Sequence, residues 1–197
     1  IVRKWFGDPS HFILEELKKS LRGNSQNEIA FHFRLLDQED LGVEILPDLT
    51  IKRAARGILL DDPRLDRDDG YTVLSQIDLK RAVSSLTIFA NKLFEISGKT
   101  TFVATDSPAV HNYLETFPSI SMIKNKDEIA DLRDMRDSHY SLTSALAIYA
   151  LSKRKKVVSF PFKSGFSRSA SCLGGSEYEV TTSVEEFERV ILQYSNL

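Results

Sequence analysis

Residues 29–33 form an almost wholly apolar run of the length of a β-strand. A strand with this pattern is covered on both faces, which is typical of a parallel sheet flanked by helices. His32 interrupts the run and Arg34 follows it two residues later, so in an extended chain their side chains point to the same side. The run therefore predicts an α/β fold with two polar side chains near the end of a buried strand.

Short apolar segments alternate with helical patterns along the rest of the chain. Strands are predicted at about residues 101–105, 121–123, 157–160 and 178–182. Helices are predicted at about residues 9–22, 79–97, 108–117, 141–152, 167–173 and from 184 onward. Such alternation favours a mostly parallel sheet with right-handed crossovers and helices on both faces. We expect residues 1–197 to form a single Rossmann-like α/β domain.

One segment, residues 38–71, departs from this alternation. It is punctuated by glycine and proline and is dense in charged side chains, with a short helix expected around residues 51–59. Long loops in compact domains tend to be functional or mobile, although a dense run of charges is usually just a solvated surface. We expect a long excursion from the domain here.

Composition excludes several classes of function. The formal net charge of −2 gives no reason to expect nucleic-acid binding, which usually needs a concentrated basic face. No apolar run approaches the roughly 20 residues of a transmembrane helix, and no signal-peptide pattern opens the chain. Cys172, the single cysteine, has no partner for an internal disulfide and favours a reducing compartment. We therefore expect a soluble, cytoplasmic protein.

Common catalytic motifs are missing from the sequence. It contains no G-x-G-x-x-G, no P-loop and no G-x-S-x-G. His11, His111 and His139 do not have the spacing of metal ligands. We expect neither a bound metal nor another cofactor, and a hydrolase or metalloenzyme has little support.

Polar side chains follow three of the predicted strands. Because loops after parallel strands gather at one edge of a sheet, we expect these groups to meet. Arginine can grip phosphate with two hydrogen bonds, and a helix N-terminus offers N–H donors to an anion. Serine hydroxyls can donate to phosphate, glycine permits close approach, and a carboxylate can accept from the edge of a guanine. The set suits a nucleoside diphosphate; its members are His32, Arg34 and Asp37, then Thr105, Asp106 and Ser107, then Ser164, Gly165, Ser167 and Arg168.

Each group also has a structural interpretation. His32 can be a satisfied core histidine, and Arg34 can brace Asp37. Residues 106–108 can be an ordinary helix cap, and residues 167–168 a cap followed by a surface charge. These interpretations stay open at the level of sequence.

Taken together, the three segments resemble the donor-binding half of the GT-B fucosyltransferases, which include the nodulation-type, core α-1,6 and protein O-fucosyltransferases. The resemblance covers about residues 28–175. The H-x-R motif of that family with a following acidic residue corresponds to residues 32–34 and Asp37. Its strand ending in A-T-D corresponds to residues 102–106, and its serine-rich segment to residues 164–168.

The resemblance implies an inverting, metal-independent transfer of fucose from GDP-fucose to a glycan or another hydroxyl acceptor. It implies that Arg34 holds the β-phosphate and stabilises the leaving diphosphate. It further implies that His32 and Asp106 lie by the guanine, and Ser164 and Ser167 by the phosphates.

The chain departs from the family in two respects. Several members have a second arginine directly after the first, where this chain has Leu35. GT-B enzymes also have an N-terminal domain that helps bind the acceptor, and this chain is too short for a full one, which leaves a fragment, a minimal enzyme or a binding-only relative. The alternative hypothesis is a non-catalytic α/β module that binds a nucleotide or uses residues 38–71 to bind a protein partner, with Arg34 and Asp37 purely structural.

Overall fold

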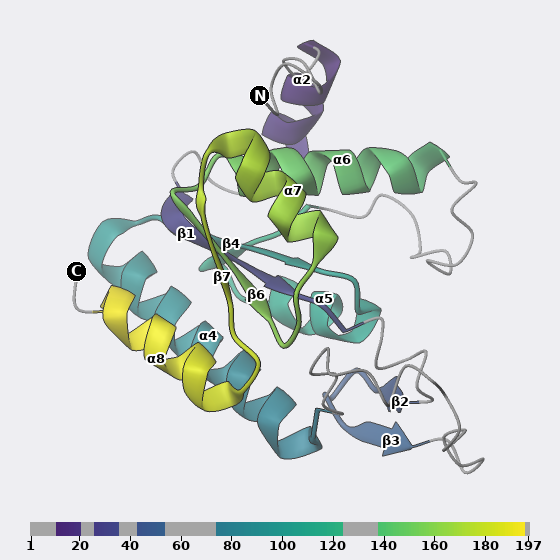
Figure 1. Ribbon diagram of the computed structural model, residues 1–197, viewed down its shortest axis with the longest axis vertical. Helices are drawn as coiled ribbons and strands as arrows, with labels where there is room; N and C mark the ends of the chain where they lie inside the picture. The colour runs from purple at the N-terminus through teal and green to yellow at the C-terminus, as the bar shows by residue number, and fades with distance from the viewer. Residues whose placement is uncertain (1–10, 21–25, 36–42, 54–73, 124–137, 196–197) are drawn as a thin grey trace.

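The structure is a computed structural model that describes residues 11–20, 26–35, 43–53, 74–123 and 138–195. Its centre is a five-stranded, all-parallel sheet in the order β5-β4-β1-β6-β7 (Figure 1). The strands are β1 (Gln26–Phe33), β4 (Thr100–Thr105), β5 (Ile120–Ser121), β6 (Lys156–Phe160) and β7 (Glu177–Val180). Successive strands are added outward from β1, first to one side and then to the other. The order therefore reverses between β1 and β6, at the position where open α/β sheets bind ligands.

Helices cover both faces of this sheet (Figure 1). One face carries α2 (His11–Ser20), α6 (Ser138–Ser152) and α7 (Gly165–Gly174). The other carries α4 (Gln76–Ser97), α5 (Pro108–Glu115) and α8 (Val184–Ser195). The predicted Rossmann-like α/β fold is thus confirmed. Among the described residues, no helix is both long and apolar enough to cross a bilayer.

Two hydrophobic clusters lie on opposite faces of the sheet, because the side chains of each strand alternate between the faces. From β1, Ile29, Phe31 and Phe33 enter the cluster beneath α4 and α8. Ala30, the residue between the first two, enters the cluster beneath α2, α6 and α7. Both sides of β1 are therefore covered, as its largely apolar sequence predicts.

The segment around residue 50 differs from the prediction. Residues 51–53 form strand β3 (Ile51–Arg53), which pairs antiparallel with β2 (Val43–Ile45), so the helix expected at 51–59 is wrong at its start. The turn between the strands is closed by a hydrogen bond from Leu46 N–H to the carbonyl of Thr50 (2.8 Å). Ile45 and Leu49 are buried in the core cluster beneath α4, which anchors the hairpin to the domain. The rest of the predicted helix lies outside the described residues.

Candidate functional site

The candidate site lies at the carboxyl edge of the sheet, where the adjacent strands β4, β1 and β6 end. The three ends lie level with one another, because Phe33 is in register with Thr105 on one side and with Phe160 on the other. Arg34 leaves β1, Asp106 leaves β4, and the segment that starts α7 follows β6. The structure thus brings the three predicted segments to one edge of the sheet.

Arg34 is fixed at this edge by three contacts. Its Nη1 donates to Asp106 Oδ2 at 2.7 Å. Asp106 Oδ1 accepts from the backbone N–H of Leu35 at 2.6 Å, and the backbone N–H of Arg34 donates to the carbonyl of Phe160 at 2.7 Å. The side chain of Asp106 is 10% exposed and that of Arg34 is 28% exposed. A guanidinium that is oriented by a nearly buried carboxylate and still reaches solvent is suited to bind an anion.

The partner of Arg34 is a finding of the structure. The sequence suggested Asp37 as a brace for Arg34, but Asp37 lies outside the described residues. Among the described residues, Arg34 forms an ion pair with Asp106, 72 residues away. Both oxygens of Asp106 accept hydrogen bonds from the end of β1, so this carboxylate orients Arg34.

His32 is a buried, neutral group beside Arg34. Its ring lies 5.2 Å from that of Phe166 in the first turn of α7, measured between centroids, and the residue is only 4% exposed. Burial, with a smaller effect from the Arg34 charge, lowers the pKa of His32 to about 3. Nδ1 of His32 is buried without a hydrogen-bond partner among the described residues, so within this part of the chain that ring nitrogen is not satisfied.

The start of α7 forms the third part of the site. Ser164 is the N-cap residue but makes no side-chain cap hydrogen bond, and Gly165 is exposed with open space where a Cβ would lie. Ser167 is fully buried; its Oγ lies 3.4 Å from the carbonyl of Ser164 and 3.5 Å from the hydroxyl of Tyr178. The Ser167 hydroxyl therefore faces inward, whereas Gly165 is open to an approaching ligand.

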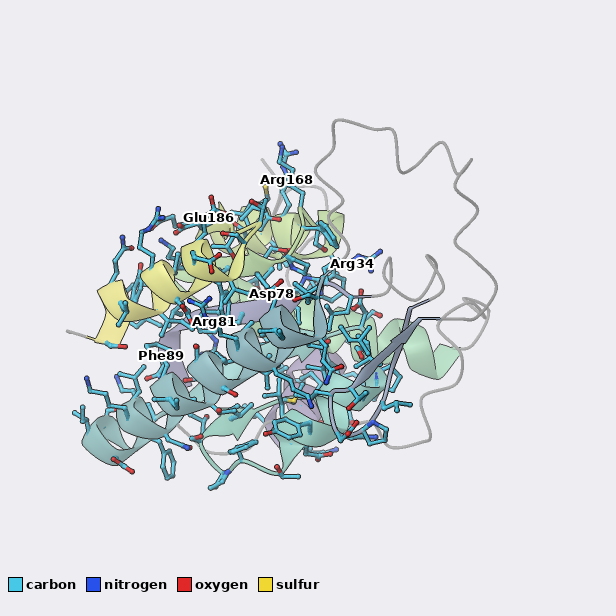
Figure 2. All side chains as sticks on the ribbon, turned by 90° about the horizontal axis from the view of Figure 1, so that it is seen from below. Arg34, Asp78, Arg81, Phe89, Arg168 and Glu186 are labelled. Atoms are coloured by element: carbon cyan, nitrogen blue, oxygen red, sulfur yellow. The ribbon has the colours of Figure 1, made fainter. Side chains whose placement is uncertain are left out.

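Tyr178 on β7 and Arg168 on α7 lie on either side of this turn. The Tyr178 hydroxyl accepts from the backbone N–H of Ser164 at 3.1 Å, and it lies 3.3 Å from the carbonyl of the same residue. Tyr178 could not be predicted as part of the site, because a tyrosine in a strand carries no signal of a contact with a helix start. Arg168 is exposed and projects outward from α7 (Figure 2). No described contact joins Arg168 to Arg34.

The end of β4 contributes two hydroxyl groups. Thr105 Oγ1 accepts from the backbone N–H of Ser107 at 3.1 Å. Ser107 is the N-cap residue of α5, yet its Oγ is buried without a hydrogen-bond partner among the described residues. The segment is thus a helix start, but Asp106 binds Arg34 and the Ser107 side chain makes no cap.

A cavity of about 60 Å³ lies beside Thr105. It is lined by residues 102–105 of β4, by His111 of α5, by Met122 and Ile123 after β5, and by two residues of α6. Burial lowers the pKa of His111, and the opposing effect of Glu115 is smaller. The cavity therefore has an uncharged lining next to the Arg34–Asp106 pair.

Among the described residues, no three His, Cys, Asp or Glu side chains gather closely enough to hold a metal ion. Cys172 is exposed on α7. Against known proteins, no family model, no curated protein and no solved structure matches this chain.

Proposed function

We propose that this protein is a fucosyltransferase-like glycosyltransferase that binds GDP-fucose at the carboxyl edge of its sheet and transfers fucose to a hydroxyl acceptor, such as a glycan. The domain then corresponds to the donor-binding half of a GT-B enzyme. In an inverting transfer, the acceptor oxygen bonds to the anomeric carbon of fucose and displaces GDP. The bond to the β-phosphate oxygen breaks, GDP leaves with its electron pair, and the acceptor proton passes to a base.

The observation that carries this proposal is the position of Arg34. It follows the central strand next to the point where the strand order reverses, and it is held there by Asp106 at 2.7 Å. Negative charge develops on the diphosphate as the glycosidic bond breaks. A guanidinium that is already oriented stabilises this charge without first reorganising, which is the main way a protein lowers such a barrier.

The surrounding groups support binding of a nucleotide. The exposed N-terminal turn of α7 at Gly165 can approach a phosphate closely, and its helix dipole favours negative charge. His32 stays neutral at physiological pH, so its ring nitrogens are available to a neutral part of the ligand. Asp106 acts as a positioning residue for Arg34.

Calorimetry tests the proposal directly. We expect binding of GDP and GDP-fucose, and weaker binding of GMP, which has no β-phosphate for Arg34. Arg34→Ala should weaken GDP binding by at least roughly tenfold, because it removes a charged hydrogen-bond donor from the phosphate. Arg81→Ala is the matched control: Arg81 also makes ion pairs, with Glu185 and Glu188, but it does so between α4 and α8 (Figure 2). Equal absence of binding for GDP, GDP-fucose, GMP and ADP would exclude the proposal.

A non-catalytic module is the second candidate, and one observation favours it. The contacts from Asp106 to Arg34 and Leu35 also brace the ends of β1 and β4, which is a sufficient structural role for the pair. This alternative predicts that Arg34→Ala lowers the melting temperature strongly and that GDP does not change it. The glycosyltransferase proposal predicts a folded variant whose melting temperature no longer rises with GDP. Thermal melts of the wild type and of Arg34→Ala, each with and without GDP, separate the two.

A further inference from the structure

A buried polar atom without a hydrogen-bond partner needs an explanation, and a bound water, ion or ligand is one such explanation. The described residues contain three such side-chain atoms. Two of them, His32 Nδ1 and Ser107 Oγ, lie at the candidate site. The third, Arg154 Nε, lies at the opposite edge of the sheet, in the turn between α6 and β6.

Arg154 is a partly buried cation without a carboxylate partner among the described residues, and its Nε atom is buried. Its guanidinium carbon lies 5.8 Å from the centroid of the Phe102 ring, and Phe102 itself is fully buried. Within the described chain, the guanidinium makes no ion pair and no hydrogen bond. Burial lowers the pKa of Arg154 to about 10, and no neighbouring carboxylate opposes this effect. A partly buried charge that lacks an anionic partner has lost part of its hydration, and a bound anion would offset that cost.

Two carboxylates near this turn are already paired with the lysines that follow Arg154 in the sequence. Glu28 pairs with Lys155 at 2.7 Å, and Glu177 pairs with Lys156 at 2.9 Å. Lys153, on the other side of Arg154, is exposed. Lys153 therefore adds a second positive charge beside Arg154, whereas the charge of Lys155 is paired with Glu28, and no described carboxylate contacts Arg154.

We propose that Arg154 is the anchor of a second binding site, which takes an oxyanion (a phosphate, sulfate or carboxylate group) at the amino edge of the sheet. The planar guanidinium offers paired donors that fit two oxygens of such a group, and the exposed Lys153 raises the local positive potential. The site is separate from the carboxyl edge, because β6 has five residues and at about 3.3 Å per residue spans roughly 15 Å. It is therefore independent of the proposed transferase activity.

The test uses inorganic sulfate and the variant Arg154→Met, which keeps an unbranched apolar side chain over Phe102 and removes the charge. Melting temperatures are measured in sodium sulfate and in sodium chloride at equal ionic strength. In chloride, Arg154→Met should be as stable as the wild type or more so, because an unpaired, partly buried charge is gone. In sulfate the order should reverse, because only the wild type gains from the bound anion.

Three controls separate this site from other effects of sulfate. Arg189→Met, an exposed arginine on α8, corrects for the general stabilisation of proteins by sulfate. Arg34→Ala should keep the rise in melting temperature with sulfate that Arg154→Met loses. This result is expected whether or not the protein binds GDP. Arg154→Lys should retain the charge but bind sulfate roughly tenfold more weakly, since it cannot donate in bidentate fashion. A side chain that only packs on Phe102 would instead make Arg154→Met less stable by the same amount in both salts, and this result would overturn the proposal.

The same salts distinguish the sources of the oxyanion. A melting temperature that rises with phosphate and sulfate but not with acetate assigns the site to a phosphate or sulfate group, whereas a rise with acetate as well includes carboxylates of a peptide. A wild type that gains no more from any of the three than Arg154→Met does would also overturn the proposal.

Discussion

The carboxylate of Asp106 connects the end of β4 to a side chain and a backbone N–H at the end of β1. Asp106→Ala removes both contacts and leaves a partly buried cation without this counter-charge. We expect the free energy of unfolding to fall by about 2–3 kcal/mol. Asp106→Asn keeps an acceptor for Leu35 and should lose less. Chemical denaturation measures both variants, with Glu185→Ala, which breaks the exposed ion pair to Arg81, as the control that should change little.

The buried imidazole of His32 makes stability depend on pH. Its folded pKa of about 3 lies below the ordinary value of 6.5, so between these values the unfolded chain binds a proton that the folded chain does not. Stability contributed by neutral His32 is therefore full above pH 6.5 and is lost as the pH falls toward 3, by up to about 1.4 kcal/mol per pH unit.

His32→Phe removes this titration and retains a planar ring against Phe166. We expect the wild type to lose stability relative to this variant as the pH falls from 7 to 4, which denaturant titrations at each pH will measure. The comparison cancels the carboxylates and His111, which both chains share. A constant difference between the two proteins over that range would show that His32 does not stay neutral.

Single residues also set the limit of what the sequence predicts about the site. The types His32, Arg34, Asp106 and Gly165 stand out because their chemistry suits a phosphate. The contacts between these residues cannot be predicted in the same way. The contact of Arg34 with Asp106 joins the ends of two strands that are far apart in sequence, so it depends on which strands become neighbours. The inward turn of Ser167 toward Tyr178 likewise follows from the register of β7, which no local pattern contains.

At the scale of elements, α6 and α7 meet at a glycine. A Cβ on Gly174 would lie 1.9 Å from the backbone oxygen of Ser152, the last residue of α6. Because the clash is with backbone, Gly174→Ala must separate the two helices, and we expect a loss of about 3 kcal/mol or more in the free energy of unfolding. The matched control is Gly165→Ala in the same helix, where a Cβ meets nothing within 4 Å. A small, equal effect of the two substitutions would contradict the close approach.

Long elements were predicted well and the shortest were not. Helix α4 has a capping serine, Ser75, whose Oγ accepts from Asp78 N–H at 3.1 Å, and it ends at Gly98 with φ of 68°. These local signals agree with one another, and the end at Gly98 was predicted, whereas the helix begins at Gln76 and not at the predicted residue 79. The three-residue strands β2 and β3 lack such agreement, because their pairing and their burial against α4 decide the structure. The Pro47–Asp48 turn, with Thr50 N–H donating to Asp48 at 3.0 Å, was the signal that could have found the hairpin.

At the scale of the whole molecule, alternating strands and helices suffice for the fold class, because buried parallel strands need helices on both faces. The order of the strands needs more information. Right-handed crossovers restrict the arrangement, yet the same alternation fits several orders. In the observed order β1 is the central strand. The segment with the most distinctive sequence therefore lies between the ends of β4 and β6, which contribute the rest of the candidate site.

The aromatic cluster behind the site joins the sheet to α8 and lets stability be separated from binding. Phe187 of α8 contacts three phenylalanines of β1 and β6, with centroid distances of 5.5, 5.5 and 4.9 Å, and it is fully buried. Phe187→Ala should lower the free energy of unfolding by about 3–5 kcal/mol, whereas Phe94→Ala, at a 36% exposed position of α4, should cost far less. Denaturant titration measures both.

The same variant tests whether the edge of the sheet acts as a unit distinct from the core. Phe187 lies beneath the sheet and has no described contact with Arg34, Asp106 or Gly165. Where Phe187→Ala is still folded, at low temperature, its affinity for GDP should therefore equal that of the wild type, while Arg34→Ala should show the opposite combination of a retained fold and a lost affinity. If both variants lost stability and affinity in proportion, binding would depend on the fold as a whole, and Arg34 would have no specific role in it.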